Sequence, residues 1–136
     1  MEKIVKVCEE EEISEIVRKI VEDREAMVAY VTDKEGRLKG VITPRKLLKI
    51  LEMQALGAIS HPFYEGREVL GLLSSKCAKD IMGTSLTVKP DDEVKKAIDV
   101  MLDQGVYEVP VVDEKGCLLA MVNYFAILSG LIDPSN

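Results

Sequence analysis

The residue types that build metal sites and disulfides are scarce in this sequence. Its 136 residues include three cysteines and one histidine. The cysteine count is odd, and no pair among Cys8, Cys77 and Cys117 has metal-ligand spacing, so a zinc site is not indicated. We expect the three cysteines to be reduced and mostly buried thiols of a cytoplasmic protein.

Long apolar runs and an excess of positive charge are also missing. No apolar run reaches the ~18 residues of a membrane-spanning helix, and the first four residues do not form the start of a signal peptide. The formal net charge of -6 argues against general nucleic-acid binding, which needs a basic surface to displace counterions. Hydrophobic residues make up 47% of the chain, which is enough for a packed core.

Catalytic motifs are absent as well. The sequence contains no nucleophile elbow, no phosphate-binding glycine loop and no paired-carboxylate motif. His61 precedes Pro62 and has no cysteine or serine in a recognisable relation, so we expect an exposed loop histidine. The acidic run 9–12 suits the positive end of a helix dipole, and nothing nearby completes a metal site. We therefore expect neither an enzyme nor a metal protein.

What the sequence does contain is a pattern that occurs twice. A β-branched run ends in Asp33, and a turn through Gly36 leads into a second apolar strand. The same order recurs around Asp113 and Gly116, and each matching pair of residues is 80 positions apart. This spacing predicts a twofold internal repeat.

Each half is predicted to run strand, helix, strand, strand, helix. The expected strands cover residues 4–8, 28–32, 38–42, 86–88, 109–112 and 117–122. The expected helices cover residues from about 13 to 21, from 44 to about 56, from the Pro90 region to Gly105, and from 124 to 131. The resulting units are a first motif at 1–56, a linker at 57–75 and a second motif at 76–136. Because the linker carries apolar side chains, we expect it to pack on the body or on a partner chain.

Three helix ends carry recognisable signals. Thr43 followed by Pro44 predicts an N-cap and a first helical residue. Asp91 or Asp92 is expected to cap the next long helix. Gly105 is expected to close that helix in the left-handed conformation.

The second half resembles a cystathionine β-synthase (CBS) domain. The resemblance is carried by the segments 80–82, 86–91, 97–101 and 109–116, which read Asp-Ile-Met, Leu-Thr-Val-Lys-Pro-Asp, Ala-Ile-Asp-Val-Met and Val-Pro-Val-Val-Asp-Glu-Lys-Gly. The first half is similar but lacks the Asp-Ile-Met leader. Together the halves look like one tandem CBS pair, often called a Bateman module, with no catalytic, transporter or DNA-binding domain attached.

This resemblance implies an α/β fold in which two pseudo-twofold related β-α-β-β-α motifs pack sheet to sheet. It also implies two equivalent clefts between the motifs, which in this family bind adenosine compounds such as AMP, ATP or S-adenosylmethionine. The usual assembly is a homodimer, and the usual role is regulatory, acting on a partner protein.

The family's ligand motif is glycine, apolar, any residue, threonine or serine, two residues, then aspartate. There the hydroxyl and helix amides hold phosphate, and the aspartate accepts the ribose hydroxyls. In the first half Gly40 and Thr43 fit, but Lys46 stands at the aspartate position and cannot accept ribose hydrogens. With Arg45 it would attract a phosphate as a charge. The alternative is that Thr43 is only a helix cap and both cations are solvated surface.

The second half departs further from the motif, with Ala120, Asn123 and Ala126 at its three positions. Asn123 is predicted to touch a phosphate, although capping alone explains it. Tyr124 and Phe125 would stack on a base or belong to core or interface.

The other predicted ligand-binding residues lie on strands, where the resemblance implies that adenine is recognised mainly through the main chain. They are Val5, Val28, Thr87, Glu108 and Pro110. Plain strand packing is the alternative for most of them. Met27, Met82, Met101 and Met121 are expected to be core filler and not ligand surface.

Two functions remain open from the residues. The first is a stand-alone CBS pair that binds an adenine nucleotide or adenosyl compound between its motifs and signals to a partner. The alternative is a degenerate pair without a ligand that acts as a dimerisation or protein-interaction module through its apolar linker.

Overall fold

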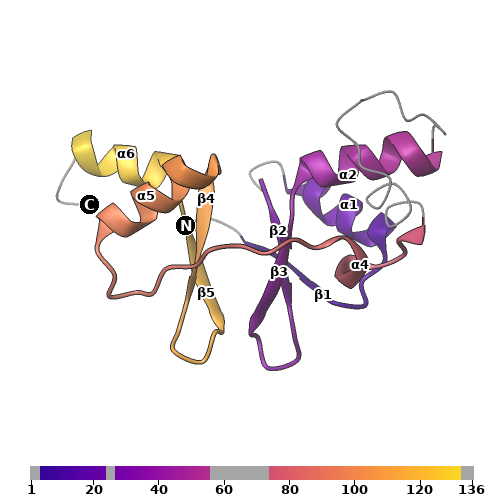
Figure 1. Cartoon of the computed structure of the whole chain (residues 1–136), viewed down its shortest axis with the longest axis horizontal. Helices are drawn as coiled ribbons and strands as arrows, with labels where there is room; N and C mark the ends of the chain where they lie inside the picture. The colour runs from indigo at the N-terminus through magenta and orange to yellow at the C-terminus, as the bar shows by residue number, and fades with distance from the viewer. Residues whose placement is uncertain (1–3, 24–26, 56–73, 133–136) are drawn as a thin grey trace.

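The computed structural model describes residues 4–23, 27–55 and 74–132. The first half contains β1 (Val5–Cys8), α1 (Ile13–Glu22), β2 (Ala29–Thr32), β3 (Leu38–Ile42), α2 (Pro44–Ile50) and the π-helix η1 (Leu51–Ala55). The second half contains α4 (Ala78–Ile81), α5 (Val94–Gln104), β4 (Glu108–Val112), β5 (Leu118–Asn123) and α6 (Tyr124–Ile132). Figure 1 shows the strands of both halves in the middle, with the helices on the outside. Most of the predicted linker, including His61, lies outside the described residues.

The sheets follow the predicted order with one exception. In the first half β1 runs parallel to β2, and β3 is antiparallel to β2. In the second half β4 and β5 are antiparallel, but the strand predicted at 86–88 is reduced to one bridge between Val88 and Val111. The pairing does not continue because the next residue that would face β4 is Pro90, which has no N–H to donate. The Lys89 N–H donates to Asp92 Oδ2 at 2.7 Å.

Two of the three predicted helix ends agree with the structure, those at Thr43 and Gly105, and the one at Asp91 or Asp92 does not. Thr43 caps α2, and Gly105 ends α5 with a φ of 65°. The prediction that Asp91 or Asp92 caps α5 is wrong, since the N-cap is Glu93, without a side-chain cap bond. Asp92 instead closes the turn at Lys89. The helix expected to reach residue 56 is α-helical only to Ile50, and η1 continues it.

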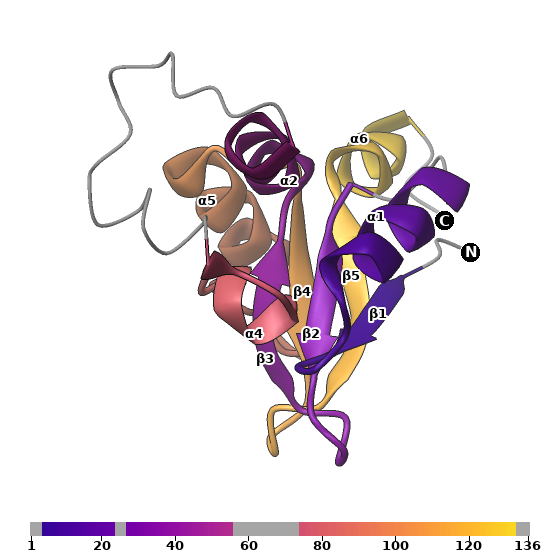
Figure 2. The same cartoon turned by 90° about the vertical axis from the view of Figure 1, so that its right-hand side faces the viewer.

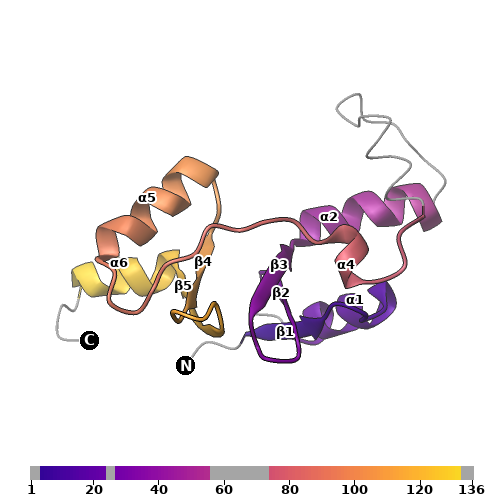
Figure 3. The ribbon, with the colours of Figure 1, turned by 60° about the horizontal axis from the view of Figure 1, so that its bottom comes forward.

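The short helix α4 packs into the core of the first half, although it lies in the segment predicted to open the second. Ala78 and Ile81 are buried among core residues of β1, α1, β2 and β3. The Ala78 N–H donates to Glu11 O and the Lys79 N–H to Glu9 O, both at 2.9 Å. Figure 3 shows α4 beside α1. The chain thus crosses from one half to the other after α4.

The two hairpin turns have matching geometry, which confirms the repeat. Asp33 Oδ1 accepts from the N–H groups of Glu35 and Arg37 at 3.0 and 2.9 Å. Asp113 Oδ1 accepts from those of Lys115 and Cys117, both at 2.9 Å. Gly36 and Gly116 complete the turns with φ values of 84° and 87°, which only glycine adopts readily. The repeated Asp-x-x-Gly sequence therefore codes for one turn used twice.

These turns also bond to each other across the two halves. The Leu38 N–H donates to Gly116 O at 2.9 Å, and the Leu118 N–H donates to Gly36 O at 3.0 Å. Figure 2 shows both turns side by side at the lower end of the molecule. Because the two bonds are reciprocal, they fix the halves in a twofold arrangement at this end.

The expectation of mostly buried cysteines is wrong. Cys8 is exposed, because it takes an outward position in the alternating strand β1, and Cys77 and Cys117 are half-buried. All three thiols are free. Among the methionines, Met101 is buried in the second core and Met82 packs on the first.

Gly40 lies where the segment directly after α4 passes close to β3. A Cβ at this position would lie 2.8 Å from Met82 Sδ and 2.9 Å from Gly83 O. Val41 and Gly83 exchange backbone hydrogen bonds of 2.9 and 2.8 Å, so this approach is fixed. The glycine of the ligand motif therefore has a packing role of its own.

Replacing Gly40 by alanine is expected to lower the free energy of unfolding by roughly 1–3 kcal/mol, because neither backbone can move away without losing its hydrogen bonds. Gly83→Ala is the matched control, since a Cβ there meets nothing within 4 Å. Its expected effect is at most about 1 kcal/mol in either direction. Urea denaturation of both variants measures the difference, and equal stabilities would contradict the close approach.

Candidate functional site

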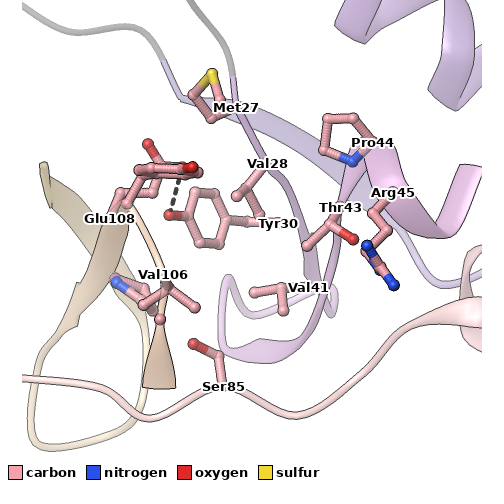
Figure 4. Close-up of a pocket in the computed structure, with 13 residues that line it drawn as sticks. Met27, Val28, Tyr30, Val41, Thr43, Pro44, Arg45, Ser85, Val106 and Glu108 are labelled. Atoms are coloured by element: carbon pink, nitrogen blue, oxygen red, sulfur yellow. Dashed lines mark hydrogen bonds between the residues drawn. The ribbon is translucent and has the colours of Figure 1, made fainter. Parts of the chain in front are cut away.

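A mostly apolar cavity of about 340 Å³ lies between the two halves (Figure 4). The first half contributes Met27 and Val28 before β2, Tyr30 of β2, Val41 of β3 and the segment 43–45. The second half contributes Ser85, the segment 105–108 and Pro110. Neither half encloses this space alone, so a bound molecule would touch both.

Thr43 and Arg45 form the polar edge of the cavity on the first half. Thr43 Oγ1 accepts from the Lys46 N–H at 3.2 Å, so the capping interpretation is confirmed. A hydroxyl that accepts this bond still carries a hydrogen that it can donate. Arg45 is exposed at the cavity edge and brings a positive charge.

Glu108 and Tyr30 form a polar pair between the halves inside the cavity. The Tyr30 hydroxyl donates to Glu108 Oε1 at 2.9 Å, and both side chains are buried, with 1% and 7% exposure. Burial, and then the carboxylate of Glu108, raise the pKa of Tyr30 far above its usual range. A tyrosine is protonated at neutral pH even without this shift, so the phenol is a hydrogen-bond donor here, and the shift extends that state to more alkaline pH.

The predicted ligand-binding residues divide into two groups. Those that line the cavity are Val28, Thr43, Arg45, Glu108 and Pro110. Lys46 belongs to the same helix start as Thr43 but is not part of the lining. Val5 is buried in the first core, and Thr87 lines a separate hollow near the hairpin turns. Ligand binding by any of these residues stays a prediction.

The second copy of the ligand motif forms a helix cap. Asn123 Oδ1 accepts from the Ala126 N–H at 2.9 Å, which repeats the bond between Thr43 and Lys46. Tyr124 packs on the second core, and its ring meets that of Tyr107 edge to face at 5.4 Å. Phe125 points outward with 76% exposure.

Sequence reasoning missed several lining residues, among them Tyr30, Val41 and Ser85. Met27, expected in the core, is 46% exposed at the cavity. Tyr30 and Val41 are cross-strand partners, so their side chains share one face of the sheet. Val28, two positions before Tyr30, shares that face as well. Side chains alternate between the two faces along a strand, so the predicted cavity residue Val28 could have pointed to Tyr30 on the same face.

The described residues contain neither a membrane-spanning helix nor a cluster of metal-binding side chains. None of the helices in the described ranges is long and apolar enough to cross a membrane. Within the same ranges, no group of three or more histidine, cysteine, aspartate or glutamate side chains is placed to hold a metal ion.

Solved structures with the same fold cover nearly the whole chain. A CBS domain-containing protein from Thermotoga maritima is 32% identical, with a TM-score of 0.77 over 97% of this chain and 87% of that chain. CBSX2 in complex with AMP is 18% identical, with a TM-score of 0.74 over 98% and 90%. The CBS domain pair of protein MJ0100, in complex with 5′-methylthioadenosine and S-adenosylmethionine, is 20% identical, with a TM-score of 0.69 over 100% and 93%.

Two curated relatives are similar over parts of their length. An uncharacterized protein of Methanopyrus kandleri is 40% identical over 52 residues, which are 38% of this chain and 26% of that protein. An uncharacterized protein of Acidianus ambivalens is 26% identical over 103 residues, which are 76% of this chain and 52% of that protein. The chain therefore spans about a quarter of the length of the Methanopyrus kandleri protein and about half of the length of the Acidianus ambivalens protein.

The sequence profile of the CBS domain family matches residues 1–53 and 78–133. These two segments coincide with the two halves of the repeat, and the fold agrees with that of solved CBS pairs. The chain therefore belongs to the CBS domain family, as a tandem pair of CBS domains.

Proposed function

We propose that this protein is a regulatory module that binds an adenosine compound in the cavity between its two CBS motifs. The observation that carries the proposal is the composition of the cavity wall, in which Thr43 and Arg45 come from one motif and Glu108 from the other. The complexes of CBSX2 with AMP and of MJ0100 with adenosyl compounds support the ligand class. Regulation of a partner protein is part of the same proposal.

The dimensions and chemistry of the cavity suit a nucleoside-sized ligand. Its volume of about 340 Å³ is at the lower end of the range for small-molecule sites. Val28, Val41 and Pro110 offer apolar contact for a base, and Arg45 offers a positive charge for a phosphate or carboxylate. Because Lys46 is not part of the lining, the proposal assigns the ribose hydroxyls to none of the residues at the aspartate position of the family motif.

Signalling requires that the ligand change the balance between two arrangements of the halves. A ligand shifts such a balance only when it contacts the arrangements differently. A molecule held by residues on both sides of the cavity meets this condition, because any change in spacing between the motifs alters its contacts. The turns at 36–38 and 116–118 hold one end of the interface, so the cavity end is where we expect the spacing to change.

Arg45→Gln and Thr43→Ala are expected to weaken binding of AMP by roughly 10-fold each, because each removes one polar contact to the ligand. Isothermal titration calorimetry measures the affinities, and thermal shift gives an independent reading, since a ligand that binds only the folded state raises the melting temperature. Arg18→Gln, on the exposed face of α1, is the matched control and should leave binding unchanged. AMP, ATP and S-adenosylmethionine are compared on the same protein. If none binds the wild type at millimolar concentration, the ligand-free interaction module becomes the better account.

We also propose that two copies pair through their helices. Exposed apolar side chains gather on α5 and α6, where Leu102, Phe125 and Leu131 are 70%, 76% and 78% exposed. A concentration of apolar surface on two adjacent helices is typical of a protein interface. Because homo-oligomers usually close with twofold symmetry, a second copy of the same face is the partner proposed.

Leu128→Glu combined with Leu131→Glu is expected to convert the dimer to a monomer, because the buried carboxylates would lose their hydration without gaining partners. Sedimentation velocity at micromolar protein concentration measures the change. Leu119→Glu provides the control, since this leucine is 52% exposed on β5 and lies outside the helices. A wild type that sediments as a monomer at all concentrations, or a double variant that remains dimeric, would contradict the pairing.

A further inference from the structure

We propose that a second hollow, next to the cavity, binds a phosphate-type oxyanion through Lys39 and the hydroxyl groups of Thr84 and Thr87. The hollow has a volume of about 280 Å³ and lies between β3, the segment 84–87 and the turn at Gly116. The inference goes beyond the proposed function, because this site lies outside the cavity and is testable with inorganic phosphate alone.

The hollow adjoins the cavity along the seam between the two halves. Ser85 lines both spaces, and Figure 4 shows it at the edge of the cavity beside Val41. On β3, Lys39 lies two positions before Val41, so both side chains belong to the strand face that is turned towards the second half. Since a strand rises about 3.3 Å per residue, Lys39 lies roughly 13 Å along the chain from Thr43. It therefore marks a second place for negative charge, at the other end of this strand.

Lys39 gives the hollow a positive charge. It is the one charged residue in the described lining, and its side chain is exposed. Within the described part of the chain it has no acidic partner. The neighbouring cation Arg37 is, by contrast, paired with Asp33 at 2.8 Å. An oxyanion that enters the hollow thus meets a charge that no carboxylate of the described residues neutralises.

The two threonines supply hydroxyl donors beside this charge. Thr87 is half-buried and Thr84 is exposed, and neither hydroxyl has a hydrogen-bond partner among the described residues. The Ser85 hydroxyl differs, because it donates to Leu86 O at 3.0 Å. Hydroxyl groups and a lysine ammonium group are suitable donors to phosphate oxygens.

Two glycines keep the hollow open. Gly40 and Gly116 belong to its lining and bring no side chain into it. Gly116 has a φ of 87°, and a Cβ at this position would meet nothing within 4 Å. Small-molecule sites begin at roughly 300 Å³, so a space of about 280 Å³ suits a single phosphate group.

The internal repeat shows that the fold does not require a cation at position 39. Eighty residues further along the chain, the equivalent position on β5 is Leu119, which is 52% exposed. The two halves therefore share an exposed strand position but not its charge. Such a difference is what a site present in only one half requires.

The same oxyanion chemistry has two sources. One is free phosphate. The other is the distal phosphate groups of a nucleotide whose adenosine occupies the cavity, because Ser85 lines both spaces. Only this second source rests on the proposed function.

Titration of the ¹⁵N-labelled full chain with inorganic phosphate, at constant ionic strength, tests the first source. The amide resonances of Lys39 and Thr87 should shift along one saturation curve. Lys39→Gln should weaken this binding about 10-fold, because the ammonium charge is lost. Calorimetry with ATP and AMP tests the second source, for which Lys39→Gln should weaken ATP binding about 10-fold and leave AMP binding unchanged. The titration that depends on Lys39 identifies the source.

Two further variants separate recognition from general charge and from stability. Lys34→Gln removes the same charge from the exposed turn before β3 and should change neither affinity. Thr87→Val keeps the shape of the side chain without its hydroxyl, so it should weaken whichever binding Lys39→Gln weakens. Thermal unfolding without ligand should give wild-type melting temperatures for all three variants.

Equal losses in Lys34→Gln and Lys39→Gln would overturn the inference. So would a Lys39→Gln variant with wild-type affinity for both phosphate and ATP, or a wild type that binds neither. A chain that binds phosphate through Lys39 but does not bind AMP, ATP or adenosine would refute the proposed function and support this site.

Discussion

The reciprocal backbone bonds between the two hairpin turns are the constraint on which the rest of the structure depends. Leu38 and Leu118 each donate to the glycine of the opposite turn, at 2.9 and 3.0 Å. These bonds require both turns to have the same shape, which Asp33 and Asp113 provide through identical side-chain bonds. With the turns joined, the two sheets face each other, and the space between their other ends becomes the cavity.

The structure departs from its twofold symmetry where a ligand would bind. Thr43 and Asn123 are equivalent caps with equivalent bonds, so the scaffold of the two motifs is shared. Glu108 and Tyr30 have no polar counterparts, because Val28 and Pro110 occupy the matching positions. Shared positions thus serve folding, while the positions that differ between the halves give the described cavity its particular chemistry.

Local features were predictable from the sequence, and contacts between distant segments were not. The 80-residue repeat, the Thr43 cap and the left-handed Gly105 follow from short-range preferences. The cap prediction at Asp92 is wrong because an aspartate two residues after a proline can close a turn as well as cap a helix. The bond between Tyr30 and Glu108 joins residues 78 positions apart, and only the packing of two sheets brings them together.

The most direct test of a shared binding site is to follow backbone amide resonances of the ¹⁵N-labelled chain during titration with adenosine. The amides of Val28 and Glu108 come from different motifs and line the same cavity. The account predicts that both resonances shift along one saturation curve with a single dissociation constant. Shifts confined to one motif, or two unrelated curves, would contradict a site built by both halves.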